Sequence, residues 1–326
     1  MTKEEAKIYK INRIALEFYK NLLNDNCGEV ARNYLTGREI HNPEGYSLGF
    51  ASDGNTLLKH IRQYKFSNED LLASGLFGKS ESGRLYDRFR NRVMFPIFDI
   101  ENNILGFGGR ALNNNGPKYL NSPETVIFKK GNNLYGANIA KKSNQDYLIL
   151  VEGYMDALQL QKNGIINVTA TLGTALTEEH AKLLKSMKEK VFLCLDSDEV
   201  GQKAAFRAFE KLSDIGISVH IVVLPDSKDP DEYINKYGRE DFLKLIENAP
   251  EYVSYSIKKL RTVYNIERIG EKLEYISKAI SLIGYIKDVN CQKSIVEELS
   301  TDTGISPESI WGKLLRNKEK QLKTGF

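Results

Sequence analysis

Cysteine is scarce in this chain of 326 residues, and the sequence lacks the ligand pattern of a zinc module. The three cysteines, Cys27, Cys194 and Cys291, lie far apart, form no CxxC pair and have no histidines at zinc-ligand spacing. We therefore expect no zinc site in this chain. An odd and sparse set of cysteines is typical of a reducing compartment, so we expect a cytoplasmic protein.

Long apolar runs are absent as well. No stretch of about 18 apolar residues is present, so we expect no membrane span. The first residues, Met1 to Glu5, lead into a polar amphipathic stretch and lack the apolar region of a signal peptide. With 41% hydrophobic and 27% charged residues the composition is that of a soluble globular protein, and its length predicts two or three domains.

The net charge of +3 is small, but its distribution is uneven. Residues 1–130 hold 19 Lys and Arg against 15 Asp and Glu, residues 131–250 hold 14 against 18, and residues 251–326 hold 13 against 10. A cation site beside a surface that binds a polyanion produces this pattern, and so does chance. Charge alone leaves both readings open.

Residue patterns divide the chain into three parts. We expect a basic, mixed α/β N-terminal part over residues 1–136, with a helical pattern over 3–35 and a β-hairpin over 92–107. Residues 137–249 alternate strands and helices, with strands predicted at 147–151, 167–170, 191–195 and 219–224. The helices predicted between and after them lie at 155–162, from 177 onward, at 201–212 and at 240–248.

This alternation predicts a parallel sheet flanked by helices, because strands joined by helical crossovers run in the same direction. Residues 250–326 show only helical patterns, with helices expected at 255–264, 272–286 and 291–301 and a helix start at 306–308. The fold class is therefore α/β in the middle part and α+β overall, with a C-terminal helical bundle.

Acidic side chains follow three of the predicted parallel strands. Glu152 comes directly after the first strand, Asp196 and Asp198 follow the third, and Asp229 and Asp231 lie just past the fourth. Ligands of open α/β sheets bind beyond the carboxyl ends of the strands, so these clusters converge on one edge. In an extended chain residues two apart face the same way, so each Asp-x-Asp pair is expected to aim at one point. Asp156, four residues after Glu152, is within reach if a helix begins there.

Each cluster alone has an ordinary structural explanation, as a solvated loop acid, a turn or a helix cap. Together they indicate a divalent-metal site, because gathered carboxylates repel one another unless a cation lies among them. Mg²⁺ prefers one or two carboxylates with water and substrate phosphate, and two ions can hold the attacking and leaving oxygens of a phosphoryl transfer.

A Glu-Gly-x-x-Asp after one strand and an Asp-x-Asp after a later strand resemble the Toprim domain of primases, topoisomerases and some nucleases. Longer stretches resemble the DnaG type of bacterial replicative primase over nearly the whole chain. They are RFRNRVMFPI at 88–97, GFGGR at 106–110, PKYLNSPET at 117–125, KGNNLYG at 130–136, VEGYMDA at 151–157, LGTA at 172–175 and KDPD at 228–231.

The resemblance implies DNA-directed synthesis of short RNA primers from ribonucleoside triphosphates on a single-stranded DNA template. It implies Mg²⁺ or Mn²⁺ at Glu152, Asp196 and Asp198, with Asp156, Asp229 and Asp231 supporting them or holding a further ion. Either Glu152 or a metal-bound hydroxide would deprotonate the primer 3′-OH. The implied nucleotide- and DNA-binding residues are Arg84, Arg88, Arg90, Arg92, Arg110, Lys118, Asn121, Lys129 and Lys130.

Two modules of the family are not recognisable here, the N-terminal zinc ribbon and the C-terminal helicase-binding domain, so we expect an excised core or a naturally short relative. Binding of a guanosine tetraphosphate-type alarmone at the basic residues is a further hypothesis, and competition with a labelled nucleotide tests it. The alternatives are a Toprim nuclease, a topoisomerase, for which the chain is too short, and a DNA-binding scaffold. A scaffold typically loses the metal ligands, and this sequence keeps them.

Overall fold

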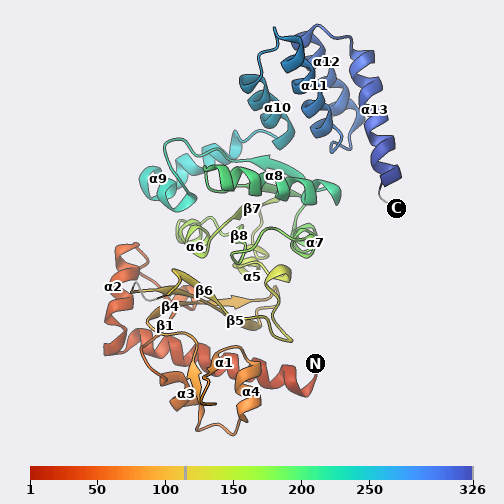
Figure 1. The fold of residues 1–326 in the computed structure, drawn as a ribbon. Helices are drawn as coiled ribbons and strands as arrows, with labels where there is room; N and C mark the ends of the chain where they lie inside the picture. Colours follow the sequence, from red (N-terminus) through yellow and green to blue (C-terminus); the bar gives the residue numbers. More distant parts are fainter. Residues whose placement is uncertain (114–115, 325–326) are drawn as a thin grey trace.

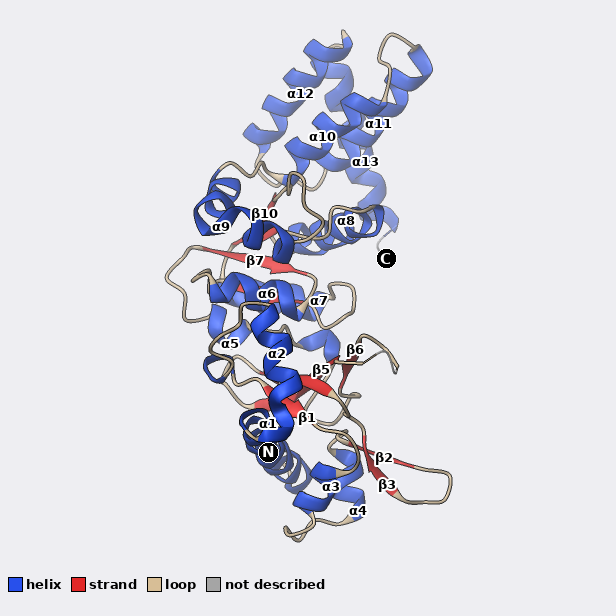
Figure 2. Cartoon of the chain, turned by 90° about the vertical axis from the view of Figure 1, so that its left-hand side faces the viewer, coloured by secondary structure: helices blue, strands red, loops and turns tan. Residues whose placement is uncertain are grey.

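The computed structural model describes residues 1–113 and 116–324, with side chains described as far as Asn317. The molecule is elongated and has three parts in chain order along its long axis, as Figures 1 and 2 show. A mixed α/β part holds the N-terminus, a parallel sheet with its helices lies in the middle, and helices α10 to α13 form the far end. No helix in the described ranges combines the length and the apolar character needed to cross a membrane.

The N-terminal part is an antiparallel sheet covered by a long helix. The sheet order is β1-β4-β5-β6, and the predicted hairpin over 92–107 is confirmed as the β4–β5 pair. Helix α1 starts with a capping box between Thr2 and Glu5 and contacts β1 and β5. The elements of this part are α1 (Lys3–Asn24), η1 (Asn26–Gly28), α2 (Glu29–Gly37), η2 (Glu44–Tyr46), β1 (Gly49–Ala51), α3 (Thr56–Ile61), α4 (Asn68–Ala73), β2 (Phe77–Lys79), β3 (Leu85–Asp87), β4 (Arg92–Phe98), β5 (Ile104–Ala111), β6 (Tyr119–Asn121) and η3 (Lys130–Asn132).

The middle part confirms the predicted parallel sheet. Its strand order is β10-β9-β7-β8, and all three pairings are parallel. The elements are α5 (Ala137–Ala140), β7 (Tyr147–Val151), α6 (Tyr154–Lys162), β8 (Val168–Ala170), α7 (Glu178–Met187), β9 (Lys190–Leu193), α8 (Glu199–Asp214), β10 (Ser218–Ile221) and α9 (Pro230–Glu247). Thr177 caps α7 as expected, with its side chain accepting the His180 N–H.

The central strand β7 is buried on both faces, and its alternate residues join two different cores. Ile149 and Val151 pack in one core with side chains of β4 such as Phe95. Leu148 and Leu150 pack in the other, which continues into α8 and the C-terminal helices. Both apolar cores therefore extend across the domain boundaries predicted after residues 136 and 249. The boundaries themselves stay predictions.

The C-terminal helices are α10 (Tyr252–Val263), α11 (Ile269–Ile283), α12 (Val289–Thr303) and α13 (Pro307–Thr324). They confirm the all-helical pattern of residues 250–326. Tyr275, Ile280 and Ile283 of α11 are buried and share the core that covers one face of the parallel sheet. The bundle is thus packed onto the middle part and is not joined to it by a linker alone.

One prediction about the middle part was wrong, namely that Asp229 and Asp231 form an extended pair, whereas the helix predicted at 240–248 is present as the part of α9 after its kink. Helix α9 begins at Pro230, ten residues before the helix predicted at 240–248, and it continues past a kink at Gly238 (φ 81°, ψ 178°). The Asp229 side chain caps this helix by accepting the Glu232 N–H, and proline at the first helical position favours the start. Asp229 and Asp231 are therefore not an extended pair that faces one point.

Candidate functional site

The predicted carboxylates gather beyond the carboxyl ends of β7 and β9, as their positions in the sequence indicated. Glu152 follows β7 directly and is half-buried. Its Oε1 accepts a hydrogen bond from the Asp196 backbone N–H at 3.1 Å, which ties the loop after β9 to the end of β7. Asp198 caps α8, where its Oδ1 accepts the Gly201 N–H at 2.8 Å. The N-terminus of α8 thus fixes the second acid of the Asp-x-Asp pair.

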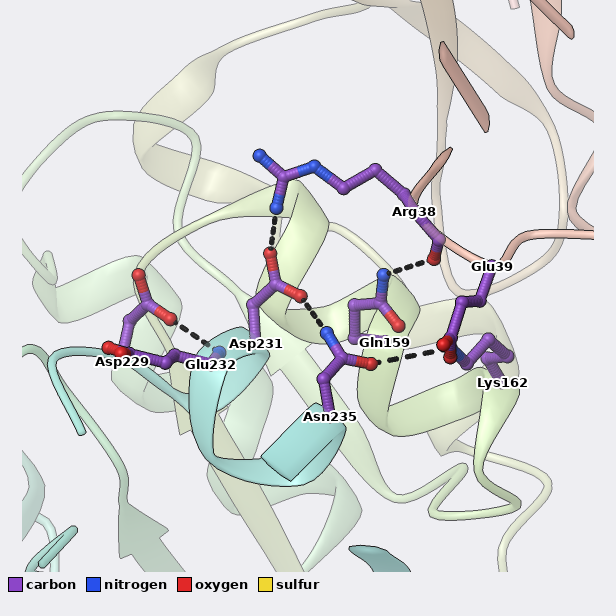
Figure 3. Close-up of polar contacts among 8 residues, drawn as sticks. All are labelled: Arg38, Glu39, Gln159, Lys162, Asp229, Asp231, Glu232 and Asn235. Atoms are coloured by element: carbon purple, nitrogen blue, oxygen red, sulfur yellow. Dashed lines mark hydrogen bonds and ion pairs between the residues drawn. The ribbon is translucent and has the colours of Figure 1, made fainter. Parts of the chain in front are cut away.

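The remaining three acids come from the starts of two helices. Asp156 lies in the first turn of α6, and its Oδ2 accepts the Gly153 N–H at 3.1 Å. Asp229 caps α9, and Asp231 is buried in the first turn of the same helix. Asp231 Oδ2 is 2.6 Å from a guanidinium nitrogen of Arg38, at the end of α2 (Figure 3). Two predicted ligands therefore stand at the N-terminus of α9, where the helix dipole favours negative charge.

Mutual repulsion shows how close these acids are. Burial, followed by the charges of Asp229, Asp196 and Asp231, raises the pKa of Asp156 to about 8. Burial and the charges of Glu152, Asp229 and Asp198 raise the pKa of Asp196 to about 6. Apart from the Arg38–Asp231 pair, negative charge is therefore uncompensated at this edge of the sheet, which fits a bound cation. In the described part of the chain, however, no three such side chains already converge as a ligand set for a metal ion.

The stability of the metal-free protein is expected to fall as pH rises from about 4 to about 8. A carboxyl whose pKa is higher in the folded state, as for Asp156 at about 8, binds its proton more tightly when folded. Its contribution is then fully present at low pH and is lost as the pH passes through the folded pKa. Thermal unfolding in a chelator, from pH 5 to pH 8, measures this slope.

An Asp156→Asn variant is expected to unfold with a shallower pH slope, because asparagine does not titrate. Asp241→Asn, which removes an exposed acid of α9 paired with Lys244, is the matched control. Equal slopes in the wild type, the variant and the control would show that the acids of this site do not repel one another.

Basic and aromatic side chains of the N-terminal part lie beside the acids. Arg110, at the end of β5, has its guanidinium carbon 5.6 Å from the Tyr34 ring centroid and 5.4 Å from that of Tyr119. The Lys118 ammonium is 5.9 Å from the Tyr119 centroid. Burial chiefly raises the pKa of Tyr119, and Arg110 and Asp156 act on it with opposite sign. The charges of both Arg110 and Asp156 therefore act on Tyr119.

Two residues from the predicted nucleic-acid surface have structural contacts instead of free polar groups. Arg92 is buried, and its guanidinium donates to the carbonyls of Gly109 and Pro117, each at 3.0 Å. Asn121 donates to the Leu172 carbonyl at 2.7 Å and accepts from the Tyr154 hydroxyl, so it joins β6 to the middle part. Both side chains therefore help to hold the fold, and their predicted contacts with nucleotide or DNA stay predictions.

The other predicted basic residues are spread over the N-terminal part. Arg84 and Arg88 are exposed at the two ends of β3, and Arg90 is exposed with a 2.7 Å hydrogen bond to Asn55. Lys129 and Lys130 lie at η3, where the Lys130 carbonyl is 2.8 Å from His180 Nε2. Both lysine side chains reach the surface, and Lys129 is the more exposed.

Arg38 is the functional candidate that the sequence did not reveal. It contacts Asp231, a residue 193 positions later, and no local pattern around residue 38 indicates a charge partner. Its place at the end of an amphipathic helix is typical of an ordinary C-terminal basic residue. Only the packing of α2 against the middle part gives it a partner, which Figure 2 shows with α2 lying next to α6.

The parallel sheet with acids after β7 and β9 defines a Toprim-type catalytic domain behind a basic N-terminal part. The family model of the N-terminal domain of the DNA primase catalytic core matches residues 18–141, and the Toprim-like model matches residues 149–234. A crystal structure of a DNA primase domain from Pseudomonas aeruginosa is similar, with a TM-score of 0.83 and 38% identity over 94% of this chain and 99% of that one. The chain therefore belongs to the family of DnaG-type DNA primase catalytic cores.

Two further relatives extend the comparison. A DnaG primase catalytic domain solved bound to single-stranded DNA is 32% identical, with a TM-score of 0.84, and covers 94% of this chain and 99% of that one. The DNA primase of Clostridium acetobutylicum is 40% identical over 94% of this chain. This chain spans about half the length of that curated relative, 51%. The activity of the whole protein is therefore a proposal for this chain.

Proposed function

We propose that this chain is the catalytic core of a DNA primase and makes short RNA primers from ribonucleoside triphosphates on single-stranded DNA during replication. The observation that carries the proposal is the meeting of two surfaces: the acidic edge of the parallel sheet acts on Tyr119, and the side chains of Arg110 and Lys118 contact the Tyr119 ring. A cation site beside an anion-binding surface is what transfer of a nucleoside phosphate requires. The relative solved with single-stranded DNA supports the choice of template.

The acids have separate proposed roles. Glu152, Asp196 and Asp198 are the proposed principal metal ligands, and Asp156, Asp229 and Asp231 support them. Divalent cations, Mg²⁺ or Mn²⁺, when bound, neutralise the triphosphate and hold the attacking and leaving oxygens. The hydrogen bond from the Asp196 N–H orients the Glu152 carboxylate, and the caps at α8 and α9 fix Asp198 and Asp229. Because positioning and charge neutralisation supply most of the catalysis in phosphoryl transfer, no protein nucleophile is needed.

The basic residues are the proposed phosphate contacts. Arg110 and Lys118, whose side chains contact Tyr119, are the proposed contacts for the nucleotide, or for an alarmone that competes with it. Arg84, Arg88, Arg90, Lys129 and Lys130 are the proposed path of the template, which makes binding sensitive to salt. Tyr135 and Tyr154 are buried in the aromatic core, so stacking on bases is proposed only for Tyr119. Contact with the replicative helicase is proposed for a domain beyond this core.

Labelled ribonucleotide incorporation on single-stranded DNA, with Mg²⁺ or Mn²⁺, tests the function. We expect short RNA from the wild type and none from Asp198→Ala, because the variant loses both a proposed ligand and the cap of α8. A template labelled at its 5′ end in the same reaction distinguishes a nuclease, which shortens the template and makes no RNA. Absence of RNA at high protein concentration with Mn²⁺ would contradict the proposal for this chain acting alone.

A further inference from the structure

The end of α2 contacts two helices that carry acids of the site, α6 and α9. The Arg38 side chain reaches Asp231 of α9 at 2.6 Å, and Gln159 of α6 donates to the Arg38 carbonyl at 2.8 Å. Glu39 forms an ion pair with Lys162 of α6 at 3.1 Å. Figure 3 shows these contacts together with Asn235, and we call the four contacting pairs the α2 clamp: Arg38–Asp231, Arg38–Gln159, Glu39–Lys162 and Asp231–Asn235.

Both carboxylate oxygens of Asp231 accept hydrogen bonds from side chains. Oδ2 accepts from Arg38, and Oδ1 accepts from the Asn235 amide at 2.6 Å. Among the described residues, the contacts recorded for Glu152, Asp198 and Asp229 are each a single backbone N–H. Within the described part of the chain, Asp231 alone of the six acids has a lysine or arginine side chain at hydrogen-bonding distance. The α2 clamp therefore places positive charge at Asp231, on one side of the acidic edge.

The backbone of the clamp holds Arg38 in a fixed direction. Arg38 ends α2, and the next residue, Glu39, has a left-handed backbone with φ 56°. This conformation is uncommon for a residue with a side chain and persists only where surrounding contacts maintain it. The Gln159 bond to the Arg38 carbonyl and the Glu39–Lys162 pair supply such contacts. Both anchor points belong to α6, the helix that carries Asp156.

We propose that Arg38 is a positioning residue for nucleotidyl transfer: it fixes the Asp231 carboxylate and keeps α6 and α9 in register with the N-terminal part. This inference rests on the proposed function and adds to it a residue outside all the motifs of the sequence. Arg38 acts through Asp231, and its charge also limits how strongly the acidic edge attracts a cation. Removal of the Arg38 charge should therefore weaken RNA synthesis, because Asp231 is no longer fixed, and should strengthen the binding of a cation to the acidic edge.

The test compares Arg38→Gln, Arg38→Lys and Glu39→Gln in the full chain, with Mn²⁺ alone as the probe of the metal site. In Arg38→Gln the melting temperature in a chelator is expected to fall by roughly 5 °C, because Asp231 keeps its charge in a buried place without a partner. Mn²⁺ binding, followed by titration calorimetry or electron paramagnetic resonance, is expected to tighten by about three- to tenfold, because a nearby positive charge is gone. RNA synthesis at saturating Mn²⁺ is expected to fall by about tenfold or more.

The two other variants are controls for charge and for the clamp segment. The guanidinium of Arg38 contacts Asp231 through one nitrogen, Nη1. The single ammonium group introduced by Arg38→Lys should therefore keep the wild-type Mn²⁺ affinity and most of the stability. Glu39→Gln removes the pair with Lys162 in the same segment but leaves Arg38 on Asp231, so RNA synthesis is expected to fall much less than in Arg38→Gln and Mn²⁺ affinity is expected to stay at the wild-type value.

Two results would overturn the inference. In the first, Arg38→Gln matches Glu39→Gln in stability, Mn²⁺ affinity and RNA synthesis. In the second, Arg38→Gln weakens Mn²⁺ binding along with stability, as loss of packing alone would cause. Failure of the proposed function is a separate result: the wild type then makes no RNA, while Mn²⁺ affinity and melting temperature still decide whether Arg38 holds Asp231.

Discussion

An Asp196→Asn variant is expected to lose at least about a thousandfold in ribonucleotide incorporation, which corresponds to ~4 kcal/mol of transition-state stabilisation. Asp196 stands at the centre of the acidic edge, because Glu152, Asp229 and Asp198 all raise the pKa of its carboxyl. Loss of its charge removes a proposed metal ligand from among them. The same substitution relieves repulsion, so the metal-free variant is expected to melt at a higher temperature than the wild type in a chelator.

The opposite signs of these two effects distinguish a metal-site acid from a structural one. Addition of Mn²⁺ should raise the melting temperature of the wild type and have little effect on Asp196→Asn. Asp241→Asn, which changes an exposed acid on α9, should behave as the wild type in both measurements. If Asp196→Asn proved less stable in the chelator, the acidic edge would not be repulsive. If it kept normal synthesis, Asp196 would not be part of the catalytic site.

Local sequence patterns predicted most of the elements that place the site. The run at 147–151 predicted a strand buried on both faces, and β7 does pack against two cores. Topology then predicted which edge of the sheet carries acids, because residues that directly follow parallel strands emerge on the same side. Glu152 and Asp196 are in contact there. Their roles as metal ligands follow from the family resemblance and remain to be tested.

Features that depend on distant packing were not predictable in the same way. The sequence Lys228-Asp229-Pro230-Asp231 suggested an extended acidic pair, but capping by Asp229 and proline at the first position begin α9 there. Arg92 alternates with Arg88 and Arg90 in the sequence, yet it alone turns inward to two backbone carbonyls. Arg38 shows no local signal at all. In each case the decisive partner lies on another element, and one sequence alone does not specify that pairing.

A methyl group added behind Asp196 is expected to damage the site without changing any charge. Gly201 lies in α8, and a Cβ at this position would be 2.1 Å from the Asp196 carbonyl oxygen and 3.2 Å from the Asp196 Cα. A separation of 2.1 Å is far inside van der Waals contact, and both atoms belong to backbone, so either α8 or the loop carrying Asp196 must move. The Gly201 N–H also holds Asp198 in place. One substitution therefore disturbs two proposed ligands.

Gly201→Ala is accordingly expected to lower the free energy of unfolding by about 1–3 kcal/mol, as overpacking does. RNA synthesis should fall by about a hundredfold, because a shift of about 1 Å in a positioned group has that effect. Gly312→Ala is the matched control, since Gly312 lies in α13 with nothing within 4 Å of the added methyl group. There the change should raise stability by about 0.5–1 kcal/mol, through better helix propensity alone.

Chemical denaturation and ribonucleotide incorporation, measured on the two alanine variants, test whether Gly201 is needed to hold Asp196 and Asp198 in place. A Gly201→Ala protein as stable and active as Gly312→Ala would mean that α8 adjusts without moving Asp196. A protein that is destabilised but fully active would mean that the displacement is absorbed away from the acids. Loss of both stability and synthesis, with Mn²⁺ binding weakened in parallel, is the expected result. That result would mean that the packing of the start of α8 and the positions of Asp196 and Asp198 depend on each other, because the same helix fixes both acids.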